Sequence, residues 1–157
     1  MSITHTTARP ASCRLWALGS RPRAPLWLRY CKSKRVSRDY RKLLVFELAD
    51  VLVVRLYRAT SGSPADERFG LRSQVRRAAV SVPSNIVEGT ARRSLSEYLN
   101  VLNIATGSAA ESRYLIDLAK RLGFIDDDTA AELGQGYERL IAQLLALIHS
   151  LESLGRE

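Results

Sequence analysis

Hydrophobic residues recur every three to four positions through most of residues 39–157, with no strand-like alternation and no internal repeat. This spacing predicts four amphipathic helices. Short breaks rich in Gly, Ser, Pro or Asp separate them. Because short connections favour antiparallel neighbours, the pattern predicts an all-α fold, an antiparallel up-down-up-down four-helix bundle.

The first two helices flank a break at Ser61-Gly62-Ser63-Pro64. The first is expected from about Tyr40 to Thr60, and the second from near Glu67 to a C-terminal cap at Gly89. Pro83 should kink the second helix or split its last turn. The predicted apolar faces are Phe46, Ala49, Val53, Leu56 and Thr60 in the first helix, and Leu71, Val75, Ala78, Ala79, Val82 and Ile86 in the second.

The third helix should begin at a capping box made by Ser94 and Glu97 and run to Leu122, with Gly123 ending it. Small residues around Gly107 permit close backbone approach, in the bundle or between subunits. Two heptad lines predict burial on two adjacent faces. One line is Tyr98, Leu102, Ala105, Ala109, Ser112, Ile116 and Ala119, and the other is Val101, Ile104, Ser108, Glu111, Leu115, Leu118 and Leu122.

Asp126 is expected to cap the fourth helix, with Asp127 and Asp128 favourably placed at the positive end of its dipole. Gly134 and Gly136 each cost about 1 kcal/mol relative to alanine, so the first turns should fray. The apolar positions are Leu133, Tyr137, Leu140, Leu144, Leu147, Leu151 and Leu154, with Ile141, Leu145 and Ile148 as a second edge. The third and fourth helices thus have more apolar surface than one bundle needs, which predicts an oligomer.

Positive charge is concentrated at two places in the 157 residues, whose formal net charge is +8. Residues 1–38 hold nine Lys and Arg and no acid, which leaves residues 39–157 with 15 basic and 16 acidic residues. Within that second part, residues 68–93 carry +5 and residues 94–157 carry −5. The basic block either pairs with acids inside an assembly or presents a face to a negative partner.

Residues 1–38 read as a basic, disordered N-terminal extension, and residues 39–157 as the bundle domain. Three interpretations of the extension remain open: a tail that contacts nucleic acid, an organelle transit peptide, or the product of an upstream start codon, with the natural chain beginning near Val36. Both cysteines, Cys13 and Cys31, lie there, so the domain has no disulfide framework. No apolar run approaches the ~20 residues that span a membrane, and we expect a cytoplasmic protein.

Little in the sequence indicates catalysis. His5 and His149 are isolated, no cluster has metal-ligand spacing, and the acids at 126–128 are explained by a helix cap, so we expect no metal, cofactor or enzymatic activity. Glu111 lies on an apolar line, where a carboxylate needs a partner. We expect it to pair with Arg76 or Arg77, within the chain or from a neighbouring one.

Several ordered motifs carry a family resemblance. They include Asp39-Tyr40-Arg41, the run Ser73-Gln74-Val75-Arg76-Arg77, the exit Pro83-x-Asn85-Ile86-x-Glu88-Gly89, and Gly107-Ser108 followed by Glu111. Residues 39–154 resemble the four-helix bundle proteins encoded in intervening sequences of bacterial 23S ribosomal RNA genes. That family includes the accessory protein of diversity-generating retroelements.

The resemblance implies a ring-like homopentamer, and for the retroelement branch it implies binding of nucleic acid and of a reverse transcriptase. One hypothesis is therefore a non-enzymatic adaptor with weak affinity for RNA or DNA, whose phosphates contact Arg72, Arg76, Arg92 and Arg93. The alternative is a protein-interaction scaffold without nucleic acid, in which Arg77, Glu88 and Glu111 form ion pairs or an oligomer interface. The net charge of −1 in residues 39–157 departs from the expected basic surface of a nucleic-acid binder.

Overall fold

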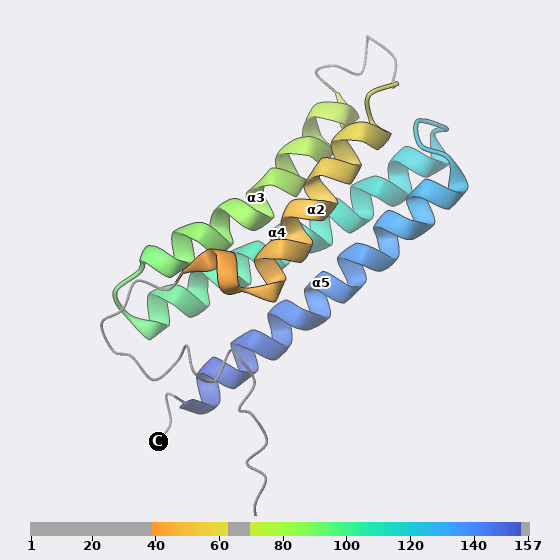
Figure 1. The fold of residues 1–157 in the computed structure, drawn as a ribbon. Helices are drawn as coiled ribbons and strands as arrows, with labels where there is room; N and C mark the ends of the chain where they lie inside the picture. Colours follow the sequence, from red (N-terminus) through yellow and green to blue (C-terminus); the bar gives the residue numbers. More distant parts are fainter. Residues whose placement is uncertain (1–38, 63–69, 155–157) are drawn as a thin grey trace, which may run out of the picture. The chain divides into compact units, whose positions relative to one another are not determined.

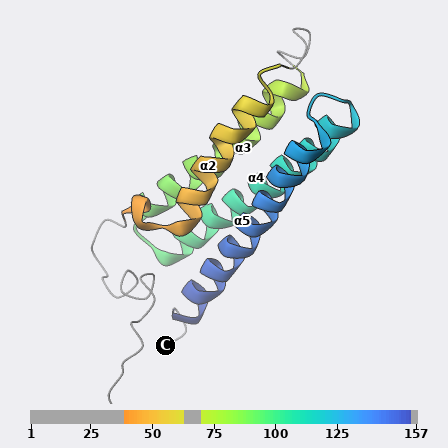
Figure 2. The same ribbon diagram turned by 45° about the vertical axis from the view of Figure 1, so that its right-hand side comes forward.

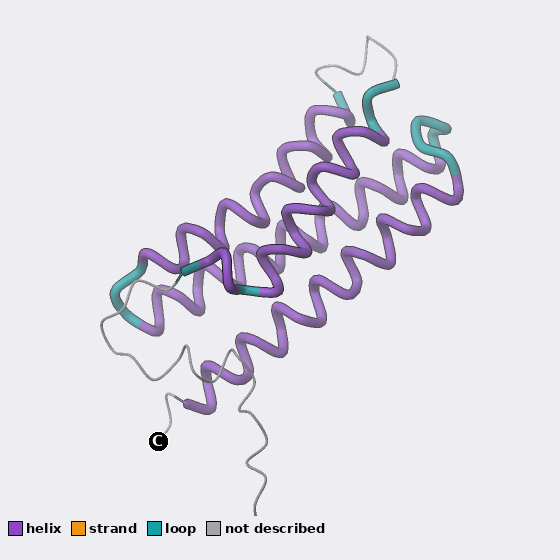
Figure 3. The backbone as a smooth tube through the Cα atoms, in the orientation of Figure 1, coloured by secondary structure: helices purple, strands orange, loops and turns teal. Residues whose placement is uncertain are grey.

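The structure, a computed structural model, describes residues 39–62 and 70–154, and these residues form helices and no strand. The elements are the 3-10 turn η2 (Tyr40–Lys42) and the helices α2 (Leu44–Ala59), α3 (Leu71–Ala91), α4 (Leu95–Arg121) and α5 (Asp127–Leu154) (Figure 1). Figure 3 shows how short the loops before α4 and α5 are. The all-helical prediction is confirmed, whereas the extension at 1–38 and the predicted helix start near Glu67 lie outside the described residues.

The four helices enclose one core. Helix α3 packs against α2 and α4, and α5 packs against the same two helices. Figures 1 and 2 both show α3 beside α2 and α5 beside α4. None of the helices in the described ranges is long and apolar enough to cross a membrane. The largest fully buried apolar side chains come from all four helices: Leu56, Ile86, Leu102, Ile116, Leu133, Leu140 and Leu144.

The first predicted helix starts later than expected, and its apolar face is confirmed only in part. Asp39 caps η2 by accepting a hydrogen bond from the Arg41 backbone N–H, and the extended backbone of Leu43 separates η2 from α2. Ala49, Leu56 and Thr60 of the predicted face are buried, whereas Phe46 and Val53 are half-buried at its border. The buried residues of α2 are Val45, Ala49, Leu52 and Leu56, and Thr60 directly after the helix is also buried.

Helix α3 has the predicted stripe but not the predicted end. All six predicted positions except the half-buried Leu71 are buried. The helix continues through Pro83 and Gly89 to Ala91, so its last turn is not split and Gly89 is not its cap. Gly89 is buried because it faces the next helix: a Cβ there would lie 2.9 Å from Cδ2 of Tyr98.

Helix α4 begins and ends as predicted. The Ser94 side chain and the Glu97 backbone N–H form one half of a capping box, and the Glu97 carboxylate and the Ser94 N–H form the other. These hydrogen bonds from Ser94 hold the pKa of Glu97 below its usual value. At the other end, Gly123 has a φ of 74°, and the Phe124 N–H donates to the Ala119 carbonyl as in a Schellman cap.

Only one of the two predicted faces of α4 is fully buried. Every residue of the line from Tyr98 to Ala119 is buried. On the second line Val101 and Leu115 are buried, whereas Ile104 is 50% and Leu122 54% exposed. The second line therefore follows the edge of the core and faces outward over part of its length.

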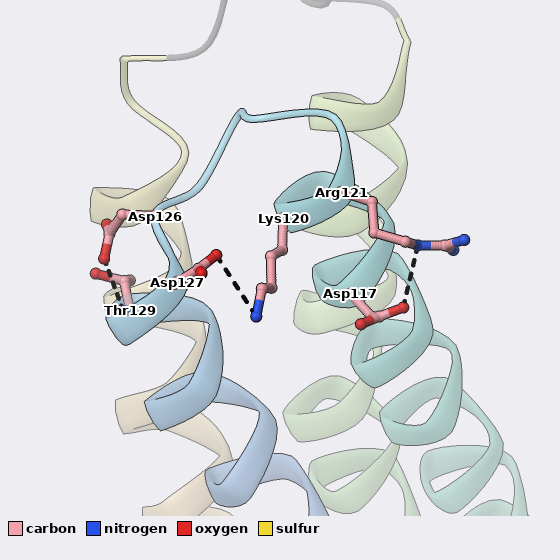
Figure 4. A network of polar contacts seen from close by, with 6 residues as sticks. All are labelled: Asp117, Lys120, Arg121, Asp126, Asp127 and Thr129. Carbon is pink, nitrogen blue, oxygen red and sulfur yellow. Dashed lines mark hydrogen bonds and ion pairs between the residues drawn. The ribbon is translucent and has the colours of Figure 1, made fainter.

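The connection from α4 to α5 is held by short polar contacts (Figure 4). The Thr129 N–H donates to Asp126 at 2.8 Å, which lowers the pKa of Asp126 and confirms its predicted capping role. Asp127 lies 3.5 Å from the Lys120 ammonium. Asp117 and Arg121 form a further ion pair one turn apart on α4. Helix capping and pairing thus account for Asp126 and Asp127 without a metal.

The helix α5 begins at Asp127 and continues through both of its glycines. Both face a neighbouring helix at short distance. A Cβ on Gly136 would lie 2.5 Å from Cδ2 of Leu52, and one on Gly134 would lie 3.2 Å from Nε of Arg113. These glycines set how closely α2 and α4 approach α5.

Tyr137 of α5 places its hydroxyl group in the core of the bundle. The Tyr137 hydroxyl has no hydrogen-bond partner among the described residues, and burial raises its pKa to about 12. The nearby Ser112 hydroxyl lowers this pKa somewhat. Ser112 donates its own hydrogen bond to the Ser108 carbonyl, so it does not donate to the Tyr137 hydroxyl. An unpaired buried hydroxyl destabilises the fold by roughly 1–3 kcal/mol.

We expect Gly89→Ala to lower the free energy of unfolding by about 1–3 kcal/mol, because the new methyl group would meet the buried Tyr98 ring. Gly62→Ala is the control, because nothing lies within 4 Å of that Cβ and Gly62 lies in the turn after α2. The control should change the free energy of unfolding by less than about 0.5 kcal/mol. Urea denaturation at one protein concentration measures both, and equal changes in the two variants would contradict the assigned role of Gly89.

Tyr137→Phe should leave the stability at pH 7 unchanged or raise it by about 1 kcal/mol, because it removes an unpaired buried hydroxyl. The folded-state pKa of about 12 exceeds the ordinary value of 10.0. Stability from this group is thus complete below pH 10 and declines as the pH rises toward 12. Denaturation at pH 8, 10 and 11.5 should show the variant losing less stability than the wild type, and parallel losses would refute the assignment.

Candidate functional site

Three arginines meet at the N-terminal end of α3. Arg72, Arg76 and Arg77 line a shallow, open depression of about 370 Å³ together with Ser73 and with Tyr57 from the last turn of α2. Arg72 and Arg76 lie four residues apart and therefore share one side of α3. Arg77 lies about 100° further around the helix axis than Arg76 and lines the depression from the neighbouring side of the helix. Among the described residues, those that line it are basic, hydroxyl-bearing or aromatic, and none is acidic.

Arg76 is held firmly from α2. Its Nε donates to Thr60 Oγ1 at 2.8 Å, its Nη2 donates to the Tyr57 carbonyl at 3.0 Å, and its guanidinium lies 4.6 Å from the centre of the Tyr57 ring. Thr60 is 2% exposed, and its hydroxyl donates in turn to the Leu56 carbonyl. Two of the five N–H donors of Arg76 are engaged, so three remain directed elsewhere.

The predicted pairing of Glu111 is not made within this part of the chain. Arg76 is bound to α2, and Arg77 Nη2 donates to Gln74 at 2.7 Å. Glu111 is exposed and forms no ion pair with a described residue. Water solvates the exposed carboxylate, which removes the burial cost that motivated the prediction. A pairing with a neighbouring chain stays a prediction.

The other two candidate arginines lie at the far end of α3. Arg92 forms an ion pair with Glu88 one turn earlier, and this pair is about half exposed. Arg93 is exposed in the connection to α4. The 20 residues between Arg72 and Arg92 correspond to about 30 Å of helix. The structure therefore brings Arg72 and Arg76 together with Arg77, and it does not bring Arg92 and Arg93 to the same site.

The sequence did not reveal a role for Tyr57, which lines the depression, or for Thr60, which accepts the hydrogen bond that holds Arg76 there. Thr60 was assigned to an apolar face, and Tyr57 was given no role. A sequence signal for Thr60 exists, since a hydroxyl at the end of an apolar line needs a polar partner. Which helix supplies that partner depends on how α3 lies against α2.

This arrangement is suited to binding an anion. Guanidinium groups make strong, often bidentate hydrogen bonds to phosphate, and a group already fixed in position loses less entropy on binding. In the described ranges, no group of three or more His, Cys, Asp or Glu side chains is placed to hold a metal ion.

Comparisons with known proteins agree with the observed fold and with the family resemblance of the sequence. The family model described as 23S rRNA-intervening sequence protein matches residues 41–146. A crystal structure of a protein of unknown function from the S23 ribosomal protein family of Bacteroides thetaiotaomicron is similar, with a TM-score of 0.63 and 22% identity over 68% of this chain and 96% of that one. No curated protein matches the chain. Since the match covers most of the described helices, this chain belongs to the 23S rRNA-intervening sequence protein family.

Proposed function

We propose that the protein is a cytoplasmic, non-enzymatic, homo-oligomeric adaptor that binds RNA or DNA through the N-terminal end of α3. The observation that carries this proposal is the convergence of Arg72, Arg76 and Arg77 on one depression whose described lining residues include no acid. Binding of phosphate there is electrostatic and hence independent of sequence. The low net charge of residues 39–157 restricts such binding to this local cluster.

The arginines at the other end of α3 are secondary in this proposal. Glu88 neutralises part of the charge of Arg92. A ligand that contacted both ends would have to extend about 30 Å along α3. Arg93 is therefore a peripheral phosphate contact, and Arg72 and Arg76 are the main ones.

The proposed arrangement of the helices is the antiparallel up-down-up-down bundle. Contacts between successive helices support it, because the residue number rises along one helix as it falls along the other. Ser81 contacts Ser108 while Gly89 faces Tyr98. The same relation holds where Lys120 pairs with Asp127 and Arg113 pairs with Glu138.

We further propose that α4 supplies a subunit interface in a ring-like homopentamer, the state that the family resemblance implies. Ile104, Tyr114 and Leu122 are all at least 50% exposed. Spacings of ten and eight residues bring them close to one side of α4, which also carries Gly107 and Glu111. Exposed apolar side chains that gather on one helix side favour association.

The same face supports the second candidate, a protein-interaction scaffold without a nucleic-acid role. In that case Arg77, Glu88 and Glu111 would serve assembly, and the arginines at the depression would bind acidic protein groups. A reverse transcriptase is the partner that the resemblance to the retroelement branch implies. Binding assays with RNA separate the two candidates.

The double variant Arg72→Ala/Arg76→Ala should bind a short RNA roughly 10- to 100-fold more weakly than the wild type at 50 mM salt, because charge-assisted hydrogen bonds to phosphate are lost. The slope of log affinity against log salt should decrease in magnitude by about 1.4 for a single strand, or 0.7 for each phosphate contact. Fluorescence anisotropy measures both quantities.

Arg139→Ala is the control for the loss of one positive charge elsewhere, because Arg139 is exposed on α5 and does not line the depression. It should change the affinity less than twofold, and Arg93→Ala should fall between the two. Equal losses for Arg139→Ala and the double variant would reduce the binding to general electrostatics and end the assignment of a site.

Ile104→Glu should dissociate the proposed oligomer, because a carboxylate would be buried without a partner in the interface. Static light scattering gives the mass, and circular dichroism checks that the variant remains helical. Val51→Glu is the control, since Val51 is 45% exposed on α2, away from this face. The interface assignment does not survive if Ile104→Glu retains the wild-type mass.

A further inference from the structure

The depression at the start of α3 has a feature that phosphate contacts alone do not require. The Tyr57 ring lies against the Arg76 guanidinium at 4.6 Å, and Tyr57 is still 42% exposed. An aromatic ring and a planar cation thus share one small site with Arg72, Arg77 and the Ser73 hydroxyl. The inference below rests on the proposed binding of nucleic acid and concerns which form of nucleic acid this site accepts.

The Arg76 guanidinium is held in place beside the Tyr57 ring. Hydrogen bonds to Thr60 Oγ1 and to the Tyr57 carbonyl fix the guanidinium, and Thr60 is itself buried. Nucleic-acid bases stack on aromatic rings and on guanidinium planes, and each stacked base contributes about 1–3 kcal/mol. Because the pair is already ordered, little conformational entropy is lost when a base packs on it.

The size and shape of the depression favour an unpaired base. Its volume of about 370 Å³ is near the lower end of the ~300–1,000 Å³ typical of small-ligand sites. In a duplex the bases are stacked inside the helix and only the backbone and the groove edges are accessible. A single strand can turn a base outward into such a depression while its phosphates remain at the rim.

We propose that this site binds single-stranded nucleic acid, with one base packed on the Tyr57–Arg76 pair and the adjoining phosphates contacted by Arg72 and Arg77. Arg77 retains four of its five N–H donors beyond its bond to Gln74. Tyr57 supplies stacking and no charge, whereas Arg72 and Arg77 supply charge. The two contributions can therefore be separated by mutation.

The test compares a 12-nucleotide RNA without self-complementarity, the DNA of the same sequence, and the duplex of each, with the full-length protein in a fluorescence anisotropy assay. The wild type should bind at least one single strand about tenfold more tightly than its duplex. Tyr57→Leu should weaken single-strand binding by roughly 5- to 100-fold, in line with the loss of one stacked base. Its duplex affinity should change less than twofold, and Tyr57→Phe should retain the wild-type affinity.

Tyr40→Leu is the matched control, since Tyr40 also contacts an arginine, Arg41, but lies in η2 and outside the depression. It should leave every affinity unchanged. Tyr57→Gln provides a second variant if Tyr57→Leu is found unfolded by circular dichroism. Tyr57→Gln should likewise weaken single-strand binding and change the duplex affinity less than twofold.

Two outcomes overturn the inference in distinguishable ways. If Tyr57→Leu and Tyr57→Gln bind single strands as the wild type does, or weaken single strands and duplexes equally, the base-stacking site is refuted. Proposed binding through Arg72 and Arg76 would survive that result as long as their double variant still loses affinity. If the wild type binds none of the four probes at 50 mM salt, the proposed function fails and the inference fails with it.

Discussion

The geometry of the bundle depends on close approach between helices at glycines. Gly89 of α3 accepts the Tyr98 ring of α4, and Gly136 of α5 accepts the Leu52 side chain of α2. A methyl group at either position would lie within 3 Å of a buried side chain, so these contacts limit how the helices can shift against one another. With two pairs of helices fixed in this way, the apolar stripes close around one core, and the end of α2 lies beside the start of α3.

That last juxtaposition creates the basic site. The buried Thr60 hydroxyl, which has to find hydrogen bonds, accepts one from Arg76 and donates one to the Leu56 carbonyl. Arg76 is thereby held against the Tyr57 ring, while Arg77, the next residue of α3, is exposed and also lines the depression. Thr60 is buried in the core, and its hydrogen bond positions the charged group of Arg76 at the surface. Thr60 therefore contributes both to the packing of the core and to the candidate site.

The sequence predicted helix starts and ends correctly where the interacting residues are only a few positions apart along the chain. The capping box of Ser94 and Glu97, the cap at Asp126 and the positive φ of Gly123 follow from interactions within a few residues. Predictions failed where a distant residue intervened. Gly89 was interpreted as a helix end, because a sequence does not reveal that the Tyr98 ring packs against it. The charge of Glu111 was assigned a burial cost that its exposed position does not impose.

The sequence by itself determined the all-helical class, the four apolar stripes and the family, since periodicity, caps and ordered motifs are properties of neighbouring residues. It also identified the arginines of α3 as the main charged feature of the domain. Only the tertiary structure decided which of them belong together. It groups Arg72, Arg76 and Arg77 beside Tyr57 and separates Arg92 and Arg93 at the other end of the helix. The physical reason is that a site is formed by side chains from two helices, and their registration depends on the packing of the whole core.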